Sequence, residues 1–231
     1  MKVRIKFKKE GLMKYIGHLD VMRYFQKLLR RADIPIAYSS GMSPHQIMSF
    51  AMPLSMGLES DAEYVDIEIT EPVSSALAIK KMNDCNAYGI EIISFKELPE
   101  GAKNAMASIK AADYAVSFRE GYKPSFSCMD ELKKMYEEPC INVIRHTKKS
   151  EGEVDIKPGI YSLSGDDDRI LMCLSCGSVL NIKPELLMGE VYKRKGLSLP
   201  DFALAIRRLE IYTEEDGRRV SLDEIGTAID E

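Results

Sequence analysis

The sequence predicts an α+β protein made of two tandem ferredoxin-like (βαββαβ) domains with antiparallel sheets. Three observations support this prediction. The 231 residues suit two domains of about a hundred residues each, the strand and helix signals follow the order β-α-β-β-α-β in both halves, and a stretch rich in Pro, Gly and small residues separates the halves. The expected boundaries are 1–98 for the first domain, 99–110 for the linker and 111–231 for the second domain.

The first half opens on a strand with two different faces. Val3, Ile5 and Phe7 alternate with charged residues, which is the period of a half-buried strand. Residues 18–33 carry apolar side chains at helical spacing, and Pro35 ends that helix. The later elements are expected as strands at 34–38, 49–56, 63–70 and 89–97 and as a helix at 72–86 that starts with Pro72.

The second half repeats this order without repeating the sequence. Strands are expected at 111–118, 140–146, 154–163, 169–174 and 204–212, and helices at 126–138 and 184–195. This set holds one strand more than the motif needs. Split βαβ units of this kind favour an antiparallel sheet with both helices on one face.

Composition excludes several classes of protein. The opening residues carry a charge at every second position, and no run of about 18 apolar residues occurs. We therefore expect neither a secretory signal nor a membrane span. The five cysteines are odd in number and unevenly spaced, which favours reduced thiols and a cytoplasmic location.

Positive charge is concentrated at the N-terminal end. Residues 1–31 hold ten Lys and Arg against two acids, in a chain whose net charge is −4. Arg4, Lys6 and Lys8 would stand on the open face of the first strand, where RNA-recognition modules bind phosphates and stack bases. Arg23 and Lys27 on the following helix would add to this surface. The alternative is that carboxylates on neighbouring strands pair with these cations, or that the second domain covers the face.

The loop at residues 38–46 is a second candidate site. Tyr38, Ser40 and Gly41 lie in a segment whose backbone N–H groups are suited to an anion. If this loop folds against the start of the helix at 18–33, then His45 would share a pocket with His18 and Asp20. Two imidazoles there are expected to act as an acid–base pair on RNA or as ligand donors. The alternative is that both histidines are structural or solvated.

Cys173 and Cys176 form the one CxxC pair, a spacing typical of metal or redox sites. Residues three apart on a strand point to opposite faces, which prevents shared coordination. A second CxxC is absent, and so is the CxxxCxxC spacing of a radical SAM cluster. We expect no metal and no cofactor in this chain.

Several short segments together resemble one bacterial family. They are GHLD at 17–20, RADIP at 31–35, YSSGMSPH at 38–45, FAMPLSMG at 50–57, ES at 59–60 and EYVD at 63–66, with VDIKP at 154–158 and KPE at 183–185. This combination resembles the uncharacterised radical SAM-linked proteins. One departure is that the family pattern tends to continue Pro-His with Pro and a basic residue, where this chain has Gln46 and Ile47.

The resemblance implies a partner more readily than a reaction. Members stand beside, or are fused to, a cobalamin-binding radical SAM protein, and some lie near genes of ribosome and RNA processing. It therefore implies that the iron–sulfur cluster, SAM and cobalamin belong to the partner. The first hypothesis is a non-catalytic adaptor that presents an RNA or ribonucleoprotein substrate to that partner. The alternatives are an RNA-processing or RNA-modifying enzyme using His18 and His45, and a protein-only interaction module.

Overall fold

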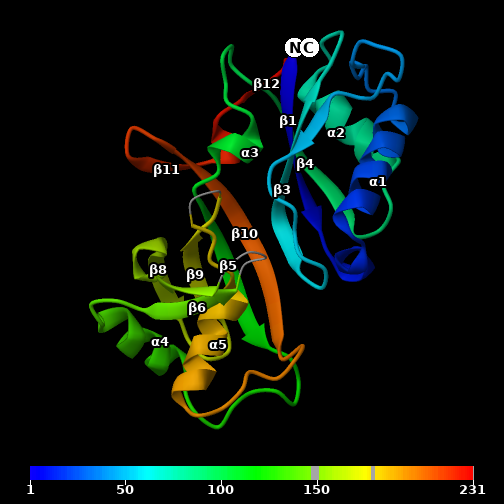
Figure 1. Ribbon diagram of the computed structural model, residues 1–231. Helices are drawn as coiled ribbons and strands as arrows, with labels where there is room; N and C mark the ends of the chain where they lie inside the picture. Colours follow the sequence, from blue (N-terminus) through cyan, green and yellow to red (C-terminus); the bar gives the residue numbers. More distant parts are fainter. Residues whose placement is uncertain (147–150, 178–179, 231) are drawn as a thin grey trace. The chain divides into compact units, whose positions relative to one another are not determined.

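The computed structural model describes residues 1–146, 151–177 and 180–230. The chain divides into two compact units: residues 1–110 together with 208–231, and residues 111–207. Both are mixed α+β, and the strand pairs within each unit are antiparallel (Figure 1). The predicted fold class is confirmed at this level.

The first unit contains an antiparallel sheet in the order β12-β4-β1-β3, with β2 on the far side of β3. Its elements are β1 (Lys2–Lys9), the 3-10 helix η1 (Gly11–Tyr15), α1 (His18–Arg31), β2 (Met48–Phe50), β3 (Glu59–Glu68), α2 (Ser75–Asp84), β4 (Ile90–Glu97), α3 (Ala105–Ser108), β11 (Arg218–Ser221), η3 (Leu222–Glu224) and β12 (Thr227–Ala228). Strand β10 (Leu204–Glu215) enters this unit at residue 208.

Helices α1 and α2 cover one face of this sheet (Figure 1). The alternation in β1 explains why: Val3, Ile5 and Phe7 are fully or almost fully buried beneath them. The Phe7 and Phe25 rings pack with centroids 4.5 Å apart, and Phe50 meets Phe25 edge-on at 5.4 Å. Burying such aromatic side chains dominates the energetics of a core.

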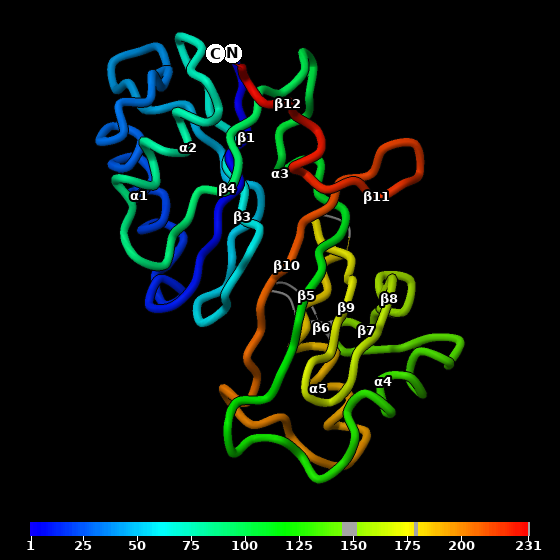
Figure 2. The backbone as a smooth tube through the Cα atoms, turned by 180° about the vertical axis from the view of Figure 1, so that it is seen from behind, coloured from blue at the N-terminus to red at the C-terminus, as the bar shows by residue number. Residues whose placement is uncertain are grey.

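The opposite face carries α3 and the C-terminal segment, as the two views of the backbone show (Figures 1 and 2). Ala105 of α3 and Leu222 of η3 are fully buried, and β12 pairs with β4. Residues 99–110, expected as a linker, therefore belong to the first unit. Residues 208–231 belong to it as well, although the sequence placed them in the second domain. The reason is that their apolar and charged groups bind this sheet.

The element boundaries of the first unit differ from the sequence prediction in several places. Helix α2 begins at Ser75, after Ser74 rather than at Pro72, because the Ser74 hydroxyl caps the helix by accepting from Leu77 N–H at 3.4 Å. The strand expected at 34–38 is reduced to two isolated bridges, of which one joins Tyr38 to Gln46. The extended stretch expected at 49–56 forms a strand only over Met48–Phe50.

The second unit contains a sheet in the order β5-β9-β8 and a separate β6–β7 hairpin. Its elements are β5 (Ala111–Phe118), α4 (Cys128–Glu137), β6 (Asn142–His146), β7 (Glu151–Asp155), η2 (Lys157–Gly159), β8 (Ile160–Gly165), β9 (Ile170–Ser175), α5 (Pro184–Arg194) and the first residues of β10. The strand expected at 154–163 is split by η2, since Pro158 has no N–H to donate to a ladder. The hairpin contains the strand expected at 140–146 and the beginning of the strand expected at 154–163.

Candidate functional site

Arg4 does not present its charge to solvent. Its guanidinium is buried and bidentate to Asp66 on β3, with Nε 2.8 Å from Oδ1 and Nη2 3.0 Å from Oδ2. It also donates to the carbonyl oxygens of Leu222 and Lys103, and Asp66 accepts from Ala105 N–H at 2.8 Å. Every group of the pair is satisfied within the first unit. The expectation of a phosphate-binding Arg4 is therefore wrong, because the cation already has a carboxylate.

Lys6 is also paired inside the first unit. Its Nζ lies 2.7 Å from Oε2 of Glu210 on β10, and both side chains are 16% exposed. The Tyr64 hydroxyl donates to the other oxygen of Glu210 at 2.5 Å, and the Lys6 ammonium lies 5.8 Å from the centre of the Tyr64 ring. The Tyr64 side chain is buried as well.

This arrangement gives the protein a defined response to high pH. Burial, and then the negative charge of Glu210, raise the pKa of Tyr64 well above its usual range. An unfolded tyrosine ionises near pH 10, so above that pH the folded state holds the extra proton. Stability therefore falls as pH rises, by up to about 1.4 kcal/mol per pH unit from this group. In urea titrations from pH 9.5 to 11.5, Tyr64→Phe should show a shallower decline than the wild type. Identical slopes would contradict it.

Lys8 completes the row near the end of β1. Its Nζ lies 3.1 Å from Oε2 of Glu91 on β4, and the hydrogen bond to Glu91 raises the pKa of Lys8. This pair is more exposed than the other two, with 36% of the Lys8 side chain accessible. The cations of β1 that were expected to bind RNA thus face carboxylates of their own unit, which is the alternative of cross-strand ion pairing.

The two candidate histidines lie at different positions along α1. His18 begins the helix and packs edge-on against Phe50, with ring centroids 5.4 Å apart. His45 is exposed, and its Nδ1 lies 2.9 Å from the Ser39 hydroxyl. The neighbouring Gln46 donates to the Gln26 carbonyl, about two turns further along α1. The expected shared pocket is not formed.

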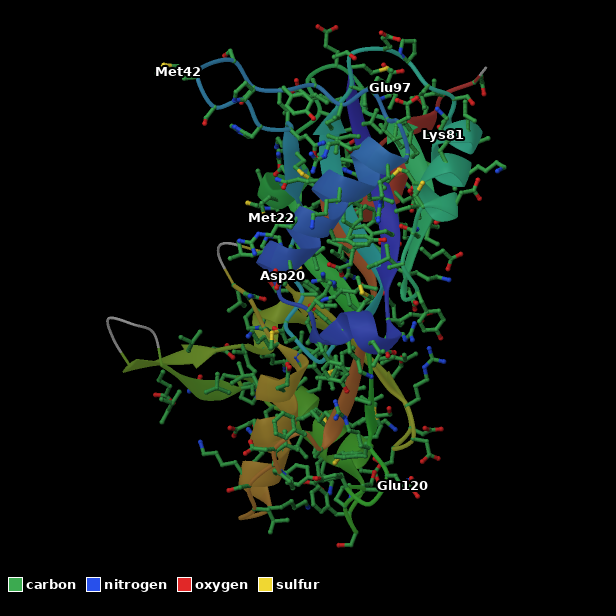
Figure 3. All side chains as sticks on the ribbon, turned by 90° about the vertical axis from the view of Figure 1, so that its right-hand side faces the viewer. Asp20, Met22, Met42, Lys81, Glu97 and Glu120 are labelled. Carbon is green, nitrogen blue, oxygen red and sulfur yellow. The ribbon has the colours of Figure 1, made fainter. Side chains whose placement is uncertain are left out.

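Figure 3 shows the same separation, with Met42 at the tip of the loop far from Asp20 on α1. Asp20 is exposed and pairs with Arg23 three residues on, at 3.3 Å. Lys27 is also exposed on this helix. These charges form a solvated helix face, and among the described residues Asp20 makes no contact that would orient either histidine as a base.

The loop at residues 38–46 is closed by its own hydrogen bonds. Ser39 N–H donates to the His45 carbonyl at 2.8 Å, and Ile47 N–H donates to the Ala37 carbonyl at 2.9 Å. Tyr38, Ser40 and Gly41 are exposed, and Gly41 has a φ of 112°, where side chains are strained. The loop is therefore a projecting surface feature and does not cover the start of α1.

The two cysteines of the CxxC pair are buried in the second unit. Cys173 lies on β9, in register with Asp113 and Ser162, and Cys176 follows the strand. Among the described residues, no three His, Cys, Asp or Glu side chains come close enough to hold a metal ion. No described helix has the length and apolar character needed to cross a membrane.

Sequence reasoning missed a second buried charge cluster on the helix side of β1. Arg208 is bound to Glu63 through Nε and Nη2, and Nη2 also donates to the Met52 carbonyl at 2.9 Å. Lys9 is buried nearby and donates to the Ile16 carbonyl at 3.1 Å. Loss of hydration, which the charge of Glu63 only partly offsets, lowers the pKa of Lys9.

This cluster borders a cavity of about 10 Å³ that His18, Phe50 and Pro53 also line. A space of that size holds about one water molecule. Two of the segments that carry the family resemblance, at 17–20 and 50–57, therefore meet around buried charges. The sequence signal that was available is Lys9, which breaks the alternation of β1 with a second consecutive lysine.

Large apolar side chains are exposed around η1. Leu12 and Tyr15 belong to η1, Leu19 follows in the first turn of α1, and Met56 and Tyr88 come from neighbouring turns. Backbone hydrogen bonds join the two turns to η1, because Gly57 N–H donates to the Lys14 carbonyl at 2.8 Å and Glu10 N–H donates to the Gly89 carbonyl at 2.9 Å. We call these five residues the η1 patch. Exposed apolar groups that gather in this way are typical of protein-interaction surfaces.

Comparison with known proteins gives a family but no activity. No curated protein matches the sequence. A chain in the crystal structure of a Cbf5-Nop10-Gar1 complex is similar, with a TM-score of 0.47, 11% identity, and coverage of 93% of this chain and 50% of that one. This chain thus spans half the length of that neighbour, and a likeness so low carries no functional argument.

A family model, described as an uncharacterised protein conserved in bacteria (DUF2344), matches residues 2–184. This match covers most of the chain and includes every segment on which the resemblance rests except part of the KPE motif at 183–185. The bacterial, uncharacterised family predicted from the sequence is confirmed, whereas the radical SAM link stays a prediction. The chain belongs to the DUF2344 family of uncharacterised bacterial proteins.

Proposed function

We propose that this protein is a non-catalytic adaptor that binds a protein partner through the η1 patch. The observation that carries the proposal is the contrast between two surfaces. The three cations that were expected to bind RNA are paired with carboxylates of their own unit, whereas Leu12, Tyr15 and Leu19 expose apolar area to solvent. A cation that is already paired with a carboxylate gains little free energy by binding a phosphate. Burial of exposed apolar area, in contrast, favours association with another protein.

The partner we propose is the radical SAM protein that the family resemblance implies. The motif segments at 17–20 and 50–57 contain Leu19 and Met56, so the residues that carry the resemblance also contribute to the η1 patch. Iron–sulfur, SAM and cobalamin chemistry would then belong to the partner chain. A cytoplasmic location fits such a partner.

We also infer that both units are ferredoxin-like. In the first unit, the order β4-β1-β3-β2 with α1 and α2 as the crossovers is the order of a split βαβ pair. In the second, β8 and β9 follow α4, and the β6–β7 hairpin is an insertion. This inference supports a recognition role only by analogy, since one fold serves many functions.

Co-purification tests the proposed function. Tagged protein, co-expressed with the radical SAM protein of the same bacterium, should retain that partner after nuclease treatment and a wash at about 0.5 M salt, because apolar contacts are not screened. Leu12→Ser and Leu19→Ser should each weaken the complex about tenfold or more. Leu77→Ser, which alters an exposed leucine on α2, is the matched control.

Two outcomes would contradict the proposal: retention of no partner, and equal binding by the patch variants and the wild type. For an RNA role we would test the exposed cations of α1, which include Lys27, Arg30 and Arg31. If RNA binds there, its affinity should fall steeply between about 50 and 200 mM salt. The adaptor proposal expects no such binding.

A further inference from the structure

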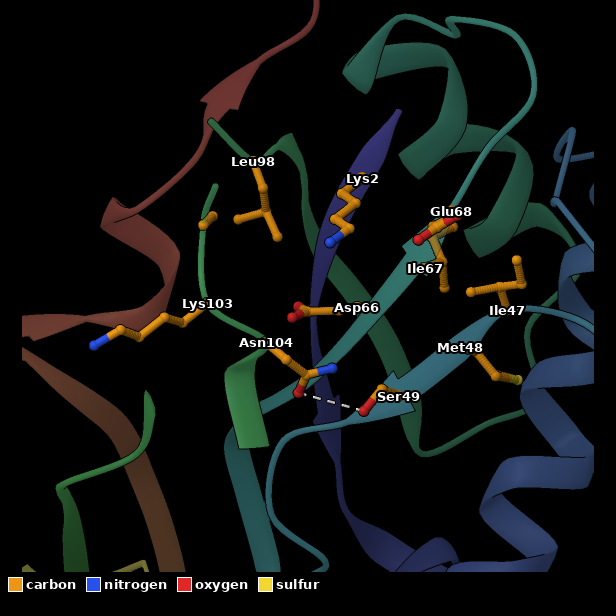
Figure 4. A pocket seen from close by; sticks show the side chains of 11 residues that line it. Lys2, Ile47, Met48, Ser49, Asp66, Ile67, Glu68, Leu98, Lys103 and Asn104 are labelled. Atoms are coloured by element: carbon orange, nitrogen blue, oxygen red, sulfur yellow. Dashed lines mark hydrogen bonds between the residues drawn. The ribbon is translucent and has the colours of Figure 1, made fainter. Parts of the chain in front are cut away.

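A pocket of about 140 Å³ lies beside the exposed ends of β1, β2 and β3, next to residues 98–104 (Figure 4). It is separate from the η1 patch and from the cavity beside Lys9. A dry protein cavity of about 150 Å³ holds benzene, so this pocket has room for a ligand of about six or seven heavy atoms.

Two opposite charges face each other across the opening. Lys2 and Glu68 are partners in the β1–β3 register, and Figure 4 shows the ammonium and the carboxylate turned toward the space between them. Neither side chain has an ion pair in the part of the chain that the structure describes. The other charged groups of the pocket are occupied or turned away: Asp66 is neutralised by Arg4, and Lys103 points outward.

A neutral donor lies below this pair. Asn104 Oδ1 accepts from Met106 N–H at 2.9 Å and from the Ser49 hydroxyl at 3.4 Å. Because a backbone N–H can bond only the oxygen of the amide, the orientation of this side chain is fixed. The amide NH₂ is then left to donate into the pocket, where Figure 4 shows it.

Apolar side chains form the rest of the wall. Ile47 and Met48 border the pocket on the β2 side, and Leu98 borders it on the opposite side. A ligand that fits must therefore carry a positive group, a negative group and a short apolar part within a few bonds of one another.

We infer that this pocket binds a free α-amino acid with a short aliphatic side chain. The carboxylate would bind the Lys2 ammonium and the Asn104 amide, and the ammonium group would bind Glu68. The side chain would lie against Met48 and Leu98. A ligand with so few heavy atoms can gain only a small binding free energy, so a dissociation constant on the order of 0.1–1 mM is expected.

Calorimetric titration of the full chain with L-2-aminobutyrate tests the inference. Butyrate lacks the ammonium group and n-propylamine lacks the carboxylate, so each should bind about tenfold or more weakly than the amino acid. Lys2→Met and Glu68→Gln should weaken binding of the amino acid to a similar degree. Lys80→Met, which alters an exposed lysine on α2, should bind as the wild type does.

Absence of saturable binding up to about 10 mM L-2-aminobutyrate would overturn the inference. Equal affinity for butyrate and L-2-aminobutyrate would also overturn it, because Glu68 would then contribute nothing. Both results leave the adaptor proposal unaffected, since the η1 patch and this pocket share no residue.

Discussion

Replacement of Arg4 by methionine is expected to lower the free energy of unfolding by about 3–5 kcal/mol. The substitution keeps an unbranched apolar stem but removes the guanidinium, which leaves the Asp66 carboxylate buried with the Ala105 N–H as its remaining partner among the described residues. It also removes the donor to the Leu222 carbonyl, which helps to hold the C-terminal segment on the sheet. Urea unfolding followed by circular dichroism measures the loss.

Lys27→Met is the matched control for this prediction. It removes one positive charge from the same N-terminal region, but from an exposed position on α1. No measurable change in unfolding is expected. If Arg4→Met were as stable as Lys27→Met, the Arg4 charge would not be buried as described.

Replacement of Arg208 by methionine is expected to cost a similar amount, about 3–5 kcal/mol. Arg208 is 1% exposed, and its removal leaves Glu63 buried beside Lys9 and the Met52 carbonyl without its donor. Adding Glu63→Gln should restore part of the stability, because the buried charge is then gone. Thermal unfolding of the two variants, compared with Arg23→Met as an exposed control, measures both effects.

A double variant less stable than Arg208→Met would contradict this prediction. That result would mean that Glu63 is held by Lys9 rather than by Arg208. Lys9, and not Arg208, would then be the cation that neutralises the Glu63 carboxylate.

The local signals in the sequence predicted most of the secondary structure. The alternation of Val3, Ile5 and Phe7 gave the strand and its buried face, and the apolar spacing after residue 18 gave α1. Such patterns can be recognised in a sequence because side chains that share one face recur at about every second residue in a strand and every 3.6 residues in a helix. Pro72 was misleading, since the Ser74 hydroxyl offers the helix a better start.

The sequence could not show what occupies the second face of the sheet. The partners of Arg4 and Lys6 lie far along the chain, because Asp66 is 62 positions after Arg4 and Glu210 is 204 positions after Lys6. A strand with alternating cations has the same sequence pattern whether its cations bind phosphates or pair with distant carboxylates. The same limit explains the assignment of residues 208–231 to the wrong unit, because only tertiary contacts place Leu222 and Asp223 on this sheet.

The histidine hypothesis failed for a geometric reason. Twenty-six residues separate His18 from His45, and α1 carries the chain away from His18 before the loop begins. A helix of 14 residues spans about 20 Å, and the chain comes back to His18 at Phe50, five residues after His45. The exposure of the residues of the η1 patch could not be predicted from the sequence, because Leu, Met and Tyr also occur in protein cores.

The most direct measurement is the coupling free energy between Arg4 and Asp66. Urea unfolding of the wild type, Arg4→Met, Asp66→Asn and the double variant closes the cycle, and asparagine keeps an acceptor for Ala105 N–H. If the cations of β1 serve the fold, the double variant should be more stable than the sum of the single losses predicts, by about 1–3 kcal/mol. Additive losses, together with an RNA affinity that falls in Arg4→Met, would show that this arginine binds nucleic acid instead.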